Sequence, residues 1–177
     1  MKKIIFSFAL FSVAAFADSH SKHEKHREHE AHVHGSGSLA IAFDANKGKI
    51  EFLGAAEGIL GFEYQPRTAK DKKAAAEATE RFEKDIGKIV QMDPALKCQF
   101  TKDLIGQVPE KGEEGSGKHS DWAANFSVSC AKDPVGTKIK VDFSSFERIK
   151  DVDITVLAGA IQKSVEYKGS SVIIDLN

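Results

Sequence analysis

The strongest constraint on the fold is the alternation of apolar and polar residues that recurs along most of the chain after residue 38. Residues 38–44 place Leu39, Ile41 and Phe43 on one face, and a turn at 46–48 leads into a second alternating segment. This period of two indicates half-buried strands, and the first two form a hairpin. The same pattern predicts further strands over 97–104, 121–131, 138–143, 151–157, 161–167 and 171–176.

One segment breaks this pattern with a helical period. Thr68 and Asp71 resemble a capping box with Asp in the Glu position. An alanine-rich stretch then runs to Gln91, and Asp93-Pro94 ends it. We therefore expect an α+β fold in which one long helix packs on a mainly antiparallel β-sheet, within a single domain over residues 38–177.

Two cysteines, Cys98 and Cys130, occupy apolar faces of predicted strands. In an exported chain such a pair favours one disulfide bond. The alternative, a metal-thiolate pair, lacks the close Cys-x-x-Cys spacing of zinc sites.

The N-terminus has the features of a cleavable signal peptide at residues 1–17. Lys2 and Lys3 precede an uncharged apolar stretch, and residues 15–17 form a small-x-small cleavage signal. The apolar stretch is too short to span a bilayer as a helix, although an uncleaved N-terminal anchor is the alternative. We expect a periplasmic protein whose mature chain begins at Asp18 and does not insert into a membrane. The formal net charge of −1 argues against a nucleic-acid partner.

The first mature segment, residues 18–37, is polar, charged and rich in histidine, and it is expected to be disordered without metal. Neutral imidazole is a common ligand of zinc, copper and nickel. Interleaved glutamates can add oxygen ligands or accept hydrogen bonds from the imidazoles. A solvated tail that binds nothing is the alternative. The candidate metal ligands here are His20, His23, His26, His29, His32 and His34.

A second candidate site lies at the entrance of the strand predicted from 121. His119 and Asp121 are two residues apart, so both side chains can point the same way and bind one ion. An exposed histidine without a ligand role is the alternative.

The order of several short motifs resembles one known family. His-x-His-Gly precedes the first strand, Gly61-Phe62-Glu63 follows the hairpin, 66–68 opens a charged helix, and 119–122 leads from one cysteine strand to the next. This order is similar to that of the ZrgA-like zinc-regulated periplasmic zinc-binding proteins. The resemblance implies zinc binding through the histidines named above, together with His119 and Asp121, and assistance to a zinc importer component as partner. Many relatives have His where this chain has Tyr64.

Three functional hypotheses follow. The first is a zinc-binding protein that buffers zinc or assists its uptake. The second is an envelope protein that sequesters copper or nickel for tolerance, because these ions bind imidazole at least comparably well. The third, a metalloenzyme, is disfavoured because no His-Glu-x-x-His motif, nucleophile elbow or phosphate loop is present. An interaction module that uses metal only for assembly remains a further alternative.

Overall fold

The computed structural model describes residues 35–109 and 119–177 of the chain. The predicted signal peptide and the six N-terminal histidines lie outside these residues. The elements follow the order β1 (Ser36–Asp44), β2 (Lys47–Ala55), α1 (Ala56–Leu60), α2 (Ala69–Ile89), β3 (Val90–Gln91), a 3₁₀ turn (Pro94–Leu96), β4 (Gln99–Pro109), β5 (Ser120–Ser129), β6 (Lys138–Val141), β7 (Asp151–Ala158), β8 (Ile161–Tyr167) and β9 (Val172–Asp175).

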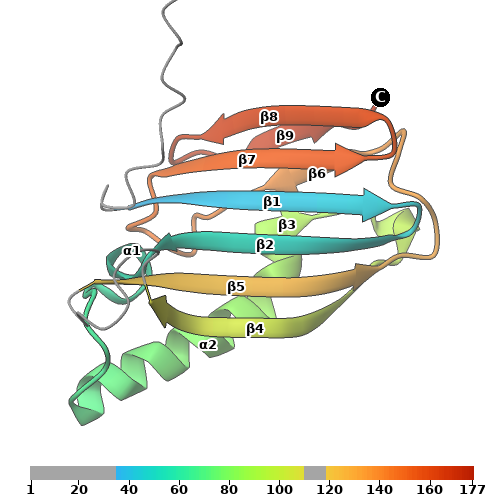
Figure 1. The fold of residues 1–177 in the computed structure, drawn as a ribbon. Helices are drawn as coiled ribbons and strands as arrows, with labels where there is room; N and C mark the ends of the chain where they lie inside the picture. The colour runs from blue at the N-terminus through green and yellow to red at the C-terminus, as the bar shows by residue number, and fades with distance from the viewer. Residues whose placement is uncertain (1–34, 110–118) are drawn as a thin grey trace, which may run out of the picture.

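The strands form two sheets (Figure 1). The larger sheet has six strands in the order β4-β5-β2-β1-β7-β8, and the smaller sheet has the order β3-β6-β9. Neighbours in both sheets are antiparallel except β1 and β7, which run parallel. The hairpin β7-β8 therefore pairs with the hairpin β1-β2 along β1, on the side opposite β5.

The expected fold class, one long helix packed on a mainly antiparallel sheet, is wrong. The described residues are mostly β-sheet, with 48% in strands and 22% in helices, and they contain two α-helices and two sheets. The helix over 69–89 shares its side of the large sheet with the small sheet, so it is only part of a layer. The predicted strands are all present, but local alternation does not reveal which strands pair.

The core lies between the large sheet and the layer formed by α2 and the small sheet. Inward-facing side chains of β1, β2, β5 and β7 meet the apolar side of α2 there. Phe82 of α2 is at the centre, with its ring centroid 5.6 Å from that of Phe52 and 4.3 Å from that of Phe146. Burial of such aromatic side chains supplies much of the stability of a domain of this size.

The predicted disulfide between Cys98 and Cys130 is confirmed. It joins the residue before β4 to the residue after β5, across 32 positions of sequence. No helix among the described residues has the length and apolar character needed to cross a bilayer.

Candidate metal centre

One end of the six-stranded sheet collects all the candidate ligands that the structure describes. Strands β1, β5 and β7 begin at this end, and β2 and β8 finish there, on the left of Figure 1. The strand register fixes this arrangement, because Ser36 pairs with Asp151, Ala55 with Asp121 and Val152 with Tyr167. Residues far apart in sequence are thereby brought to one sheet end.

Gly35, the residue that follows His34, is fixed at this end. Its carbonyl oxygen accepts hydrogen bonds from the backbone N–H groups of Lys150 and Asp151, at 2.8 Å and 3.2 Å. Gly35 has a φ of +79°, and a Cβ on it would lie 2.4 Å from the carbonyl oxygen of Arg148. Only glycine fits this close approach. The point at which the His-rich segment joins the fold is therefore set by backbone geometry.

His119 contacts a carboxylate that the sequence analysis did not choose. Its Nδ1 lies 2.5 Å from Oε2 of Glu63, and the side chains are 43% and 18% exposed, respectively. A histidine whose one ring nitrogen is bonded to a carboxylate has the arrangement that commonly orients imidazole toward a metal. With the proton on Nδ1, the ring carries its lone pair on Nε2.

The loop around Glu63 is held against the start of β5 and the end of β4. The hydroxyl of Ser120 donates to the carbonyl oxygen of Glu63, and Nε2 of Gln107 donates to Oγ of Ser120 at 2.9 Å and to the carbonyl oxygen of Tyr64 at 3.2 Å. The rings of Phe62 and Tyr64 stack at 4.9 Å. These contacts place the Glu63 carboxylate beside His119 and explain the Gly61-Phe62-Glu63 corner seen in the sequence.

The structure places the Glu63 carboxylate beside His119. Asp121 is the second residue of β5 and is 7% exposed. Within the two described ranges it does not complete a group of three close ligands with His119 and Glu63. The pair therefore offers one imidazole and one carboxylate, which is fewer than the four ligands of a structural zinc site.

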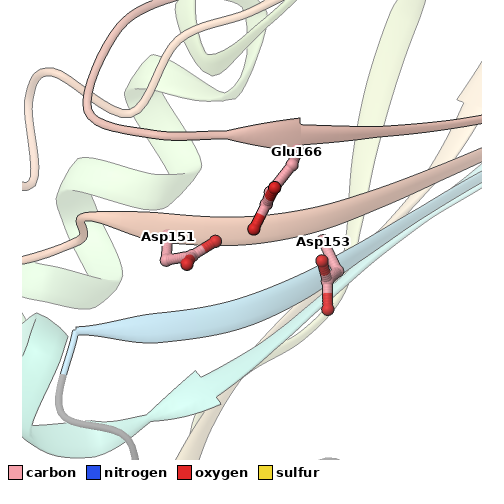
Figure 2. Close-up of side chains that lie close together, drawn as sticks. All are labelled: Asp151, Asp153 and Glu166. Atoms are coloured by element: carbon pink, nitrogen blue, oxygen red, sulfur yellow. The ribbon is translucent and has the colours of Figure 1, made fainter. Parts of the chain in front are cut away.

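A separate group of three carboxylates lies at the same sheet end (Figure 2). Asp151 and Asp153 extend from β7 and Glu166 from β8, and their ligand oxygens all lie within 4.8 Å of one another. Asp153 and Glu166 are directly opposite in the strand register, and Lys168 lies 3.1 Å from Glu166. This group was not predicted from the sequence, although the spacing of Asp151 and Asp153 puts both on one face of a strand.

The carboxylates repel one another. Burial, followed by the negative charge of Glu166, raises the pKa of Asp151 above its ordinary value, while Lys168 acts in the opposite direction. A bound cation would relieve this repulsion. Three carboxylates without imidazole are a hard, all-oxygen set, which suits calcium or magnesium better than it suits zinc. This group therefore fits a cation in general, whereas the imidazole of His119 fits a transition metal.

A family model described as "ZrgA family zinc uptake protein" matches residues 31–176. The match begins within the His-rich segment and continues nearly to the end of the chain. No curated protein matches the chain.

Proposed function

Because this chain belongs to the ZrgA family of zinc uptake proteins, we propose that it is a periplasmic protein that captures zinc through its His-rich N-terminal segment and buffers it or assists its uptake. The resemblance read from the sequence is thereby confirmed at the level of the family. The family role is zinc uptake rather than catalysis. Zinc is accordingly the cargo in this proposal and not a catalytic cofactor.

The observation that carries the proposal is that the His-rich segment joins the fold at the same sheet end as a histidine of the fold. His34 is followed directly by Gly35, which is bonded to the start of β7, and His119 precedes β5 at the same end of the sheet. Six imidazoles within fifteen positions supply more than the four ligands of one zinc ion. His119, oriented by Glu63, adds one imidazole from the ordered part of the chain.

The number of zinc ligands that the fold and the His-rich segment each offer determines their roles in binding. A single imidazole holds zinc weakly, so His119, oriented by Glu63, acts together with histidines 20–34 rather than alone. Gathering scattered ligands around one ion costs conformational entropy, which keeps the affinity of such a segment moderate. Moderate affinity suits a protein that releases its cargo to an importer.

The periplasmic location is supported by two features of the chain. Residues 1–17 have the pattern of a signal peptide. The disulfide between Cys98 and Cys130 belongs to an oxidising compartment, because the cytosol keeps most thiols reduced. Both features favour export of the mature chain.

Copper or nickel sequestration is the second candidate, because the imidazole-rich segment offers these ions equally suitable donors. A growth experiment distinguishes zinc uptake from copper or nickel sequestration. Deletion of the gene in the source organism should slow growth in zinc-depleted medium and leave copper and nickel tolerance unchanged. A complementing chain with histidines 20–34 replaced by serine should not restore growth. Loss of copper or nickel tolerance without a zinc phenotype would overturn the proposal.

A further inference from the structure

A surface cavity of about 450 Å³ lies beside α1, and none of its lining residues is among those assigned to zinc. Arg81 of α2 and Arg148 of the segment before β7 line it, together with Glu147. Both arginines are exposed, and neither forms an ion pair with another residue in ranges 35–109 and 119–177. The three ionic side chains give the cavity a net positive charge.

Arg81 is held in place by contacts that leave its charge uncompensated. Its Nη1 donates to the carbonyl oxygen of Ser145 at 3.0 Å, and its guanidinium carbon lies 5.4 Å from the centre of the Phe146 ring. Phe146 is itself buried against Phe82. A guanidinium group has five N–H donors, so most of them remain after the bond to Ser145. Their direction is restricted by the aromatic ring beneath.

Arg148 is positioned by a glycine. A Cβ built on Gly61 would lie 3.2 Å from Cζ of Arg148, 3.3 Å from Nη2 and 3.5 Å from Nη1. The Arg148 guanidinium therefore occupies the space that a side chain at position 61 would need. Gly61 has a φ of +82°, which a residue with a side chain rarely adopts. Arg148 is thus packed at the cavity without a carboxylate partner among the described residues.

We propose that this cavity binds a small ligand through an oxyanion group, either carboxylate or phosphate. Guanidinium groups bind both through paired N–H···O bonds. Two positioned arginines lose less conformational entropy on binding than mobile ones do. The cavity volume falls within the range of small-molecule sites. Glu147 repels the anion and limits the affinity, so removal of its charge should strengthen binding.

The test is calorimetric titration of the metal-free mature protein with citrate and, separately, with inorganic phosphate. We expect at least one probe to bind. Arg148→Gln and Arg81→Gln should each weaken that binding about tenfold or more, the size of a charge-assisted hydrogen bond. Glu147→Gln should strengthen it. Arg67→Gln is the matched control, because Arg67 lies over the ring of Tyr64 and does not line the cavity. Binding of only one probe identifies the preferred group.

The proposal is overturned if neither probe binds at about 10 mM, a concentration that detects even weak sites. It is also overturned if Arg67→Gln weakens binding as much as Arg148→Gln, which would indicate a general charge effect. Glu147→Gln keeps the test decisive if the arginine variants fail to fold, because it removes an exposed charge and leaves the core unchanged. Unchanged or weaker binding by that variant counts against the proposal. None of these outcomes depends on zinc binding.

Discussion

Glu63 precedes His119 by 56 residues, yet its carboxylate contacts the imidazole directly. Carboxylates in this position fix the tautomer and orientation of metal-binding histidines. Glu63 is itself positioned by the loop that packs against β4 and β5. The role proposed for Glu63 is therefore to orient His119 toward zinc.

Glu63→Gln should weaken zinc binding at His119 by about tenfold to a hundredfold, the usual effect of losing such a carboxylate. The measurement is NMR of the ¹⁵N-labelled mature protein, following Nε2 of His119 during zinc titration. The matched control is Glu77→Gln, which removes an exposed carboxylate of α2. No response of Nε2 to zinc in the unmodified protein would contradict the role given to His119.

Asp151→Asn should stabilise the protein at neutral pH. Burial and Glu166 raise the folded-state pKa of Asp151, so its ionisation opposes folding once the pH exceeds that pKa. The penalty is absent below the unfolded pKa of about 3.9. Urea unfolding should give a gain of a few tenths of a kcal/mol at pH about 7, as for like charges across strands, and none at pH about 3. Glu51→Gln, which removes an exposed carboxylate of β2, is the control. Equal gains at both pH values would contradict the charge argument.

Individual site residues differ in how far sequence could reveal them. His119 is recognisable because it stands apart from the other histidines. The contact of His119 with Glu63 cannot be recognised from the sequence, because this contact depends on how the 62–64 loop packs. Asp151 and Asp153 share a strand face by simple alternation, but Glu166 joins them only through the β7-β8 register. Histidines 20–34 lie outside the described residues, and their role stays a prediction.

At the scale of elements, the start of α2 follows directly from its sequence. Thr68 Oγ1 accepts from the N–H of Asp71 at 3.1 Å, and Oδ2 of Asp71 accepts from the N–H of Thr68 at 2.9 Å. This is the capping box predicted from Thr68 and Asp71. The bond from the Thr68 N–H is the main cause that lowers the pKa of Asp71.

Thr68→Ala should destabilise the protein by about 1 kcal/mol, because one N–H at the helix start loses its acceptor. Thr68→Ser, which keeps the hydroxyl, should stay close to the unmodified protein. Urea unfolding at neutral pH measures both. Equal destabilisation by alanine and serine would show that the methyl group, rather than the cap, matters at this position.

Strand positions and strand partners differ sharply in predictability. Alternation identified every long strand, because each buries one face. It did not identify the parallel pairing of β1 with β7, which joins segments more than a hundred residues apart. Nor did it separate the strands into two sheets. The predicted fold class was wrong because the strand pairing and the division into two sheets were not predicted, even though the helix and the long strands were.

At the scale of the whole molecule, the proposed zinc capture takes place at one end of the large sheet. It combines the attachment point of the His-rich segment, the His119–Glu63 pair and the three carboxylates. The acidic group adds negative potential, which raises the local concentration of cations. The proposed capture is therefore a joint property of the segment and the sheet end.

Zinc loading should depend strongly on pH. Protons compete with zinc for imidazole, whose ordinary pKa is about 6.5. On the proposal that several imidazoles bind each ion, apparent affinity should fall by more than about tenfold per pH unit below this value. Zinc titrations at pH about 7.5 and about 5.5 measure the effect. Equal affinity at both would mean that carboxylates dominate the coordination.

We propose that zinc binds mainly through histidines 20–34. The most direct measurement is calorimetric zinc titration of the mature protein beside a form that begins at Gly35. The second form retains the sheet end, the disulfide and the carboxylate group. We predict at least one zinc per mature chain and loss of most of this binding in the shortened form. Full zinc binding by the shortened form would contradict the claim and assign the site to the fold.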